Sequence, residues 1–350
     1  MLELIGVTKQ YLYGARLFGA LDARFRDGEI IAVYGGEGSG KTSLLKTVAG
    51  AEEYEGKILL DGEPVKLKSD DTVMVFSDGA VFGWRTVFDN LAYPLKIRKM
   101  DKVEIASRVI RAAEKAGIGA CLNFRARSLS AAERRRMSLA RLFVRDARLA
   151  LVDEIAAGLN REDADAVWED FAPLLQELAA GGATVMYATS DRAEALGISD
   201  RIIVLHDGEV KQIGSAEEIR RAPRSIWAAQ ALDARYNVLK CRLAEENGGL
   251  SLVFSDGTRL EAEKMRGRVA ESYIGKDVLC GWYPSDCEDG GKGIFSGSAA
   301  TVRRDVRGWL LGTEEGLYAL TDEKKEYISV LPRTDGITLF DAANEYCVMV

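Results

Sequence analysis

The sequence has one histidine, His206, in 350 residues and only five cysteines. No cysteine lies in a Cys-x-x-Cys pair, so the sequence predicts reduced thiols rather than a disulfide framework or a zinc site. No stretch approaches the ~20 consecutive apolar residues that a membrane-spanning helix needs. Met1–Leu4 lacks a basic segment and a cleavage pattern, so we expect no export signal.

An excess of basic charge is also absent. The chain has 47 Lys and Arg against 54 Asp and Glu, which gives a net charge of −7 and a pI near 5.2. A protein that coats DNA or RNA neutralises many phosphates with basic side chains, so this balance predicts no nucleic-acid partner. The length is enough for about two domains with a substantial core.

The most informative stretch is Gly35–Ser43, which has the P-loop pattern of glycine, four residues and Gly-Lys-Thr. The apolar run Glu29–Tyr34 before it predicts a buried strand, and Thr42–Val48 after it predicts a helix that ends at Gly50. In this order, backbone N–H groups and the helix N-terminus converge on one anion. The stretch therefore predicts a nucleoside-triphosphate site rather than a plain glycine-rich turn.

Individual residues of this loop have predicted roles. We expect Lys41 to reach the outer phosphates and the Thr42 hydroxyl to ligate Mg²⁺. The candidate nucleotide contacts in the loop are Gly36, Gly38, Ser39, Gly40, Lys41, Thr42 and Ser43.

Strand and helix patterns alternate over the first two thirds of the chain, which predicts an α/β fold with a largely parallel sheet. Besides the strand before the P-loop, strands are predicted at Leu2–Val7, Thr72–Phe76, Arg148–Val152, Ala183–Thr189 and Arg201–Leu205. Gly56–Lys66 predicts a hairpin with Asp61-Gly62 at its turn. From Val87 to about Arg145 the pattern is helical, and one face is marked by Val103, Ile105, Val109, Ile110 and Ala113.

A long helix is predicted at Arg161–Ala179, with Asn160 as its N-cap. Its inward-facing residues are expected to be Val167, Trp168, Phe171, Leu175 and Leu178. From Asn237 onward, short strands separated by Gly-rich turns predict a small all-β barrel or sandwich. We place the domain boundary within Ala222–Tyr236, giving a nucleotide-binding domain at 1–233 with a helical subdomain at about 79–145, and a β-domain at 236–350.

Two adjacent carboxylates follow the predicted strand at Arg148–Val152. Asp153 is placed to hold the water shell of a metal, and Glu154 is placed to polarise an attacking water. The alternative is a pair of solvated carboxylates at a strand terminus, which the P-loop upstream disfavours.

These motifs resemble the ATP-binding subunit of an ABC transporter, of the sugar-importer (maltose-importer ATPase) type, and the resemblance covers essentially the whole chain. It implies a P-loop ABC ATPase domain with an inserted helical subdomain and a C-terminal OB- or TOBE-like regulatory β-domain. ATP and Mg²⁺ are the implied ligands. Transmembrane permease subunits are the implied partners, with the chain on the cytoplasmic face of the membrane.

Several segments carry this resemblance. Val7–Tyr11 is similar to the family's adenine-stacking segment, which nominates Tyr11, with Tyr13 as the alternative. Leu129–Arg134 occupies the place of the signature Leu-Ser-Gly-Gly-Gln, which nominates Ser130, Ala131, Ala132 and Glu133. In the tail, Gly281–Pro284 and Ile337–Asp341 resemble motifs of the importers' β-domain.

The sequence departs from the family at the groups that act on the γ-phosphate. Ser77 replaces the Q-loop glutamine, Ser190 replaces the switch histidine, and Ala131 and Ala132 replace the signature glycines. Asn160 replaces the D-loop aspartate. Loss of one transition-state donor slows chemistry by about 10²–10³-fold. The sequence therefore predicts a site that binds ATP but hydrolyses it slowly.

Ser130 also has a purely local interpretation, because Ser-x-x-Glu before a helix is a capping box. A capped helix N-terminus can still bind an anion, so the two interpretations are compatible. The family closes as head-to-tail dimers in which one chain's signature completes the other's P-loop site. We therefore favour a heterodimer with a competent ATPase over a homodimer.

The leading interpretation is an energy-coupling subunit of an importer for carbohydrate or a related small solute. The segment Val81–Leu95 is the expected permease contact, with Trp84 and Phe88 as candidate residues. A regulatory pseudo-ATPase that acts by ATP-dependent dimer closure is the first alternative. A soluble P-loop phosphotransferase and an ABC ATPase of DNA repair or translation are the others.

Overall fold

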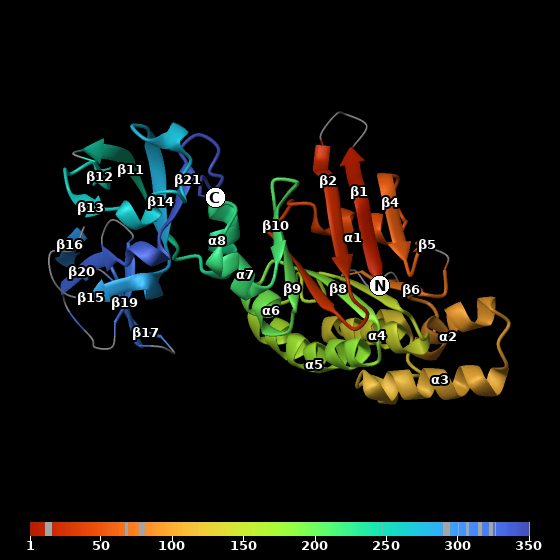
Figure 1. Cartoon of the computed structure of the whole chain (residues 1–350). Helices are drawn as coiled ribbons and strands as arrows, with labels where there is room; N and C mark the ends of the chain where they lie inside the picture. Colours follow the sequence, from red (N-terminus) through yellow and green to blue (C-terminus); the bar gives the residue numbers. More distant parts are fainter. Residues whose placement is uncertain are drawn as a thin grey trace. The chain divides into compact units, whose positions relative to one another are not determined.

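The computed structural model describes residues 1–10, 16–66, 69–76, 81–246, 248–289, 295–299, 301–305, 308–313, 317–321, 325 and 327–349. Tyr11, Tyr13 and Ser77, which the sequence analysis nominated or compared, lie outside these described residues. The chain forms two compact units, Met1–Ala216 and Glu217–Val350, and Figure 1 labels most of their helices and strands. Within the described part of the chain, no helix has the length and apolar character needed to span a bilayer.

A six-stranded sheet forms the centre of the first unit, in the order β10-β9-β3-β8-β7-β6. All neighbours from β9 to β6 are parallel, and β10 is antiparallel at the edge. The strands are β3 (Ile30–Tyr34), β6 (Thr72–Val75), β7 (Leu149–Asp153), β8 (Thr184–Thr189), β9 (Arg201–His206) and β10 (Glu209–Gly214). Every residue of β7 and β8 is buried, as expected for parallel strands covered on both faces. The predicted α/β class is confirmed.

A second sheet in this unit is antiparallel, in the order β2-β1-β4-β5. Its strands are β1 (Leu2–Gln10), β2 (Arg16–Phe25), β4 (Glu55–Leu60) and β5 (Glu63–Pro64). Asp61 and Gly62 form the predicted turn, with φ of 51° and 81°, and a type I′ hairpin needs positive φ at both positions. One apolar cluster joins both sheets and includes Leu4 of β1 and Leu151 of β7.

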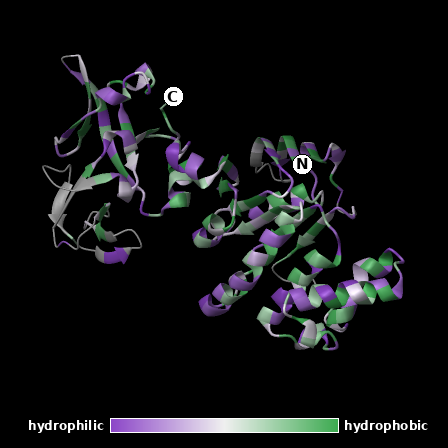
Figure 2. Cartoon of the chain, turned by 60° about the horizontal axis from the view of Figure 1, so that its bottom comes forward, coloured by the Kyte–Doolittle hydropathy of each residue, from purple (hydrophilic) through white to green (hydrophobic). Residues whose placement is uncertain are grey.

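The helices of the first unit carry both hydrophobic and hydrophilic residues along their length (Figure 2). They are α1 (Lys41–Val48), α2 (Val87–Ile97), α3 (Lys102–Lys115), α4 (Ala131–Val144), α5 (Arg161–Ala180) and α6 (Arg192–Gly197). Helices α2, α3 and α4 pack on one another and form the predicted helical region between β6 and β7. The N-cap of α5 is Asn160, whose side chain accepts from the Asp163 amide, as the sequence predicted.

Two of the predicted helix faces need correction. In α3 the buried residues are Ile105, Val109, Ala112 and Ala113, whereas Val103 and Ile110 are 77% and 41% exposed. Val103 and Ile110 are seven residues apart and share a stripe beside the buried one. In α5, Val167, Phe171 and Leu175 are buried as predicted, but Trp168 and Leu178 are only half-buried, and Ala179 fills the last inward position.

The second unit is rich in antiparallel strands. A five-stranded sheet has the order β13-β12-β11-β14-β21, and two three-stranded sheets have the orders β15-β20-β16 and β17-β18-β19. The strands are β11 (Asn237–Glu246), β12 (Gly249–Phe254), β13 (Arg259–Glu261), β14 (Asp277–Trp282), β15 (Cys287–Asp289), β16 (Phe295–Ser298), β17 (Thr301–Asp305), β18 (Gly308–Gly312), β19 (Tyr318–Thr321), β20 (Tyr327–Pro332) and β21 (Thr338–Asp341). This arrangement agrees with the predicted C-terminal β-domain.

Two short helices, α7 (Ala216–Arg221) and α8 (Ile226–Leu232), precede these strands. The sequence analysis assigned residues up to 233 to the first domain, but nearly all of both helices belongs to the second compact unit. The reason is a small apolar cluster in which Ile226 and Ala229 of α8 pack with Tyr236, Tyr283 and Phe340.

Candidate functional site

The site lies at the carboxyl edge of the parallel sheet in the first unit. Because β3, β8 and β7 are parallel neighbours, their ends share this edge: Tyr34 is paired with Thr189, and Ala188 is paired with Asp153. The segments that follow these strands are therefore brought together although they are far apart in the sequence. They carry the P-loop, the adjacent carboxylates and Ser190, the residue that the sequence analysis compared with the family's switch histidine.

The backbone of the P-loop has the shape that its glycines permit. A Cβ at Gly35 would lie 2.4 Å from the Leu205 carbonyl oxygen, so only glycine fits there. Gly38 and Gly40 have φ of 75° and 101°, and Gly40 caps the N-terminus of α1 without a side-chain bond. The first N–H groups of a helix have no partner within it, so the start of α1 at Gly40 suits the predicted anion site.

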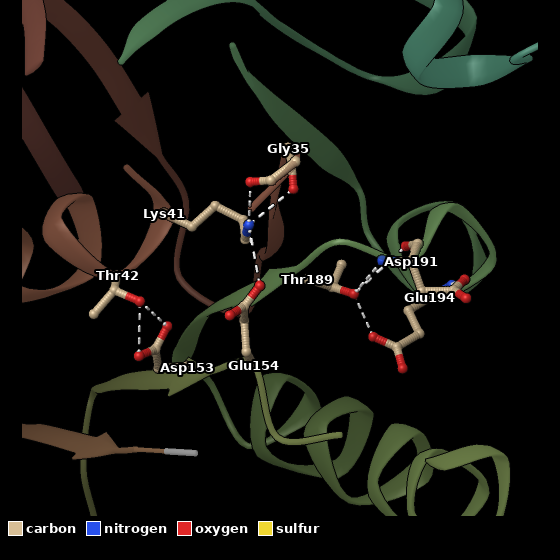
Figure 3. Close-up of polar contacts among 9 residues, drawn as sticks. Gly35, Lys41, Thr42, Asp153, Glu154, Thr189, Asp191 and Glu194 are labelled. Carbon is tan, nitrogen blue, oxygen red and sulfur yellow. Dashed lines mark hydrogen bonds and ion pairs between the residues drawn. The ribbon is translucent and has the colours of Figure 1, made fainter. Parts of the chain in front are cut away.

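The Lys41 ammonium makes one of the groups of polar contacts drawn in Figure 3. It donates to the carbonyl oxygens of Gly35 and Gly36 at 2.8 and 2.7 Å, and it lies 3.0 Å from a carboxylate oxygen of Glu154. Only 4% of the Lys41 side chain is exposed. A buried ammonium needs such partners, and these contacts hold it between the P-loop and the acidic segment after β7.

The Thr42 hydroxyl donates to Asp153, at 2.8 and 3.0 Å from its two carboxylate oxygens (Figure 3). Burial raises the pKa of Asp153; the Thr42 hydrogen bond opposes this shift, and the nearby Glu154 charge adds to it. A hydroxyl and a carboxylate are hard oxygen donors of the kind that Mg²⁺ prefers, so this pair fits the ion. Mg²⁺ would supply charge neutralisation on the outer phosphates.

A second observation also fits a phosphate cradle. The Ser39 hydroxyl oxygen is buried and has no hydrogen-bond partner among the described residues. A buried polar atom without a partner costs free energy, and a phosphate oxygen in the loop would supply one. Gly36 has no atom within 4 Å of the position of a Cβ, which leaves space on that side of the loop.

Glu154 has an unusual backbone conformation. Its φ is +40°, in the left-handed region that side-chain-bearing residues seldom adopt. Its amide donates to the Ala188 carbonyl at 3.1 Å, and its carbonyl accepts from the Ala157 amide at 2.9 Å. Such strain persists only where surrounding contacts fix it, and it is concentrated at functional sites.

The segment after β8 contains a polar network that the sequence analysis missed. The Thr189 hydroxyl donates to a carboxylate oxygen of Glu194, and it accepts from the Asp191 amide at 2.9 Å (Figure 3). A cavity of about 290 Å³ is lined by Ser190 and Glu194 together with Glu154. The Asp-x-x-Glu spacing at 191–194, with Asp191 as the N-cap of α6, is the signal that could have pointed to Glu194.

The folded structure disfavours the charged form of the Glu194 carboxyl group. Burial raises the pKa of this carboxyl group. The hydrogen bond from Thr189 opposes the shift, while the charges of Asp191, Asp165 and Glu154 add to it. Ser190 is exposed and lines the same cavity, whose other lining residues include the carboxylates of Glu154 and Asp165.

The signature-like residues form a capping box, as predicted. The Ser130 hydroxyl accepts from the Glu133 amide at 3.2 Å, and the Glu133 carboxylate accepts from the Ser130 amide at 2.7 Å. The backbone hydrogen bond from Ser130 lowers the pKa of Glu133. Ser130 and Ala131 are exposed at the N-terminus of α4, so they are accessible to another molecule.

Comparison with known proteins agrees with this geometry. The family model for ABC transporters matches residues 18–157. The oligosaccharide import ATP-binding protein MsmX of Bacillus subtilis is 32% identical over 88% of this chain and 85% of its own length. The chain belongs to the family of ABC transporter ATP-binding proteins.

Other members of the family are similarly close. The sn-glycerol-3-phosphate import ATP-binding protein UgpC of Bordetella pertussis is 32% identical over 81% of this chain and 77% of its own length. The solved structure of CbiO1 from Clostridium perfringens, part of the CbiONQ transporter complex, has a TM-score of 0.55. It is 24% identical and covers 62% of this chain and 89% of its own, so it supports the fold alone. This ABC protein is thus an ABC-type ATPase with ATP as its nucleotide.

Proposed function

We propose that this ABC protein is the energy-coupling subunit of an importer for carbohydrate or a related small solute, bound to permease subunits at the membrane. MsmX and UgpC are import proteins for oligosaccharides and for sn-glycerol-3-phosphate, and both match most of the chain. Lys41 donates to the Gly35 carbonyl oxygen, and the Thr42 hydroxyl donates to Asp153; these contacts support ATP and Mg²⁺ binding.

We further propose that the chain hydrolyses ATP weakly by itself. The observation that carries this proposal is Ser190, which lies on the cavity beside Glu154 at the position of the switch histidine. A serine has no ring nitrogen to contact a γ-phosphate or to orient a water, whereas Glu154 still supplies a carboxylate for the attacking water. Ala131 and Ala132 add a Cβ each where the family's glycines allow a close approach.

Weak hydrolysis by the chain alone is the reason for proposing that it pairs with a second, competent ATPase subunit. In a homodimer both sites would lack the same groups. In a heterodimer Ser130, at the exposed N-terminus of α4, would complete the site at the partner's P-loop, where only the signature residues come from this chain. The heterodimer is therefore the arrangement in which this chain contributes most to ATP hydrolysis.

The permease contact is proposed at the start of the helical region. Trp84 is 68% exposed, and its ring lies 5.7 Å from that of Phe82, which also contacts Tyr93 at 4.9 Å. The Arg85 guanidinium lies 5.0 Å from the Phe82 ring centroid. An exposed aromatic cluster with one cation is suited to a protein interface. Phe88 is half-buried beside it, with the Lys96 ammonium 6.0 Å from its ring.

The test combines binding with turnover. ATP affinity and hydrolysis should be measured for the purified chain alone and mixed with each ABC ATPase of the same cell. We expect micromolar or tighter ATP binding by the chain alone, slow hydrolysis, and fast hydrolysis with one partner. Fast hydrolysis by the chain alone would contradict the heterodimer proposal, and an absence of ATP binding alone and with every partner would contradict the function as a whole.

A regulatory pseudo-ATPase is the second candidate, and Ser190 also favours it. In that function ATP would close the dimer without being split. Single-turnover hydrolysis in the partner complex separates the two, because only the transport function needs the energy of hydrolysis. The soluble phosphotransferase considered from the sequence is not proposed again, because the chain belongs to the ABC family.

A further inference from the structure

The strained turn at Glu154 is held from several sides. Lys41 contacts its carboxylate, and Ala188 accepts its amide hydrogen. Among the described residues, the Glu154 carbonyl oxygen accepts one hydrogen bond, from the Ala157 amide. The direction of the Glu154 carboxylate therefore depends on where the loop through Ala157 is held.

That loop is tied to helix α4. The Arg135 guanidinium donates to the Ala157 carbonyl oxygen through Nη2 at 2.8 Å, although Ala157 itself is exposed. Arg135 is half-buried and lies five residues after Ser130, or about 7.5 Å along the helix axis. A charge-assisted bond of this length is stronger than a neutral one. It joins the helix that starts at the signature to the loop that follows Glu154.

The neighbouring arginines have different partners. Arg134 donates to the Leu129 carbonyl at 2.7 Å, back towards the signature, and Arg136 donates through Nε to Asp170 of α5 at 2.8 Å. Three consecutive arginines thus connect the start of α4 to three different segments. Arg135 is the one that reaches the loop next to Glu154.

We propose that Arg135 is a positioning residue for Glu154. By fixing the Ala157 carbonyl it holds the turn that aims the Glu154 carboxylate at the water. Because Ser130 begins the same helix, ATP of the partner subunit bound at Ser130 also fixes the Glu154 loop of this chain; this second step rests on the proposed head-to-tail dimer.

The test compares Arg135→Gln, Arg135→Lys and Arg136→Ala in the full chain. Rates are measured under single-turnover conditions with protein in excess over labelled ATP and Mg²⁺. We expect Arg135→Gln to lower the rate by about tenfold or more while the ATP affinity stays within about threefold, because misplacement of a catalytic group lowers the rate of the chemical step. Arg135→Lys should recover part of the rate, since it keeps one charged donor. Arg136→Ala removes an exposed ion pair on the same helix and should leave the rate unchanged.

Hydrogen exchange of the peptide covering 154–160 gives a readout that does not need turnover. Arg135→Gln should speed exchange of the Ala157 amide by about tenfold, because its bond to Glu154 loses support. Equal rates and equal exchange in Arg135→Gln and the natural chain would overturn the proposal. So would an equal loss of rate in Arg136→Ala. Failure of ATP binding by the natural chain would instead contradict the proposed function, and the exchange result would still decide the role of Arg135.

Discussion

The two sides of the nucleotide site differ in how many of the family's groups they retain. On the P-loop side, Lys41, Thr42 and Asp153 are all present and make contacts of 2.7 to 3.0 Å. At the switch and signature segments, Ser190 and Ala131 stand where the family resemblance implies a histidine and a glycine; in the proposed head-to-tail dimer Ala131 belongs to the other chain's site. Both sides are built on well-formed elements, so the difference is chemical rather than one of folding.

We propose that this difference separates ATP affinity from the rate of hydrolysis. Binding of a triphosphate is distributed over many loop amides, one ammonium and one metal, and loss of a single contact weakens it only in part. Hydrolysis depends on a few groups that act in the transition state, each worth about 3–4 kcal/mol. We therefore expect the substitutions at the switch and signature segments to lower the hydrolysis rate more than the ATP affinity.

On the P-loop side, Lys41→Ala is expected to have the largest effect on ATP affinity. The ammonium is the charged donor for the outer phosphates, and its loss removes about two or three charge-assisted contacts. We expect the ATP affinity to fall about 100-fold or more in a calorimetric titration with Mg²⁺. Lys57→Ala on β4, which is exposed, is the control and should bind like the natural chain. Retained affinity in Lys41→Ala would remove the basis of the comparison.

Among substitutions that affect the chemical step, Glu154→Gln should lower the hydrolysis rate most. The amide keeps the shape of the side chain but cannot accept a proton from water. We expect the single-turnover rate to fall about 100-fold. ATP affinity should hold within about threefold, since Lys41 is then released from its 3.0 Å ion pair. Glu162→Gln, an exposed residue in the first turn of α5, serves as the matched control. Unchanged turnover in Glu154→Gln would assign the water to another group.

The elements around the site could be predicted from the sequence because their signals are local. The strand, loop and helix of the P-loop, the Asp61-Gly62 turn and the Asn160 cap each depend on residues within a few positions of one another. The capping box at Ser130 is of the same kind. Propensity, turn chemistry and capping decide such features before tertiary packing acts.

The features that the sequence did not reveal depend on contacts between distant segments. Arg135 and Ala157 are 22 residues apart, and nothing in the pattern around either one predicts their hydrogen bond. The positive φ of Glu154 arises from the junction of β7, β8 and the P-loop. The exposure of Val103 could not be predicted because the apolar residues of α3 form two neighbouring stripes, and only tertiary packing selects the one that is buried.

A gain of function would sharpen the comparison between the two sides. Ser190→His returns an imidazole to the position beside Glu154, and the cavity of about 290 Å³ gives it room. We expect single-turnover hydrolysis to rise about tenfold, less than a full recovery because Ala131 and Ala132 remain substituted. Ser190→Ala should leave the rate unchanged. No increase with histidine would mean that another substitution limits turnover.

The smallest effect concerns stability at the same cavity. Burial raises the pKa of Glu194 above its ordinary value of 4.5, so its neutral form fits the folded state better than its charged form. The stability this group contributes is present in full below pH 4.5 and is lost as the pH rises through the raised pKa. Glu194→Gln stays neutral and should be more stable than the natural chain at pH 8, by roughly 0.5–1 kcal/mol or about 1–4 °C in Tm of the first unit. The gain should shrink as the pH falls towards 4.5, whereas Glu169→Gln on the exposed face of α5 should change Tm little at any pH. A gain that is the same at every pH would show that packing of the amide, and not the buried charge, sets the stability at this position.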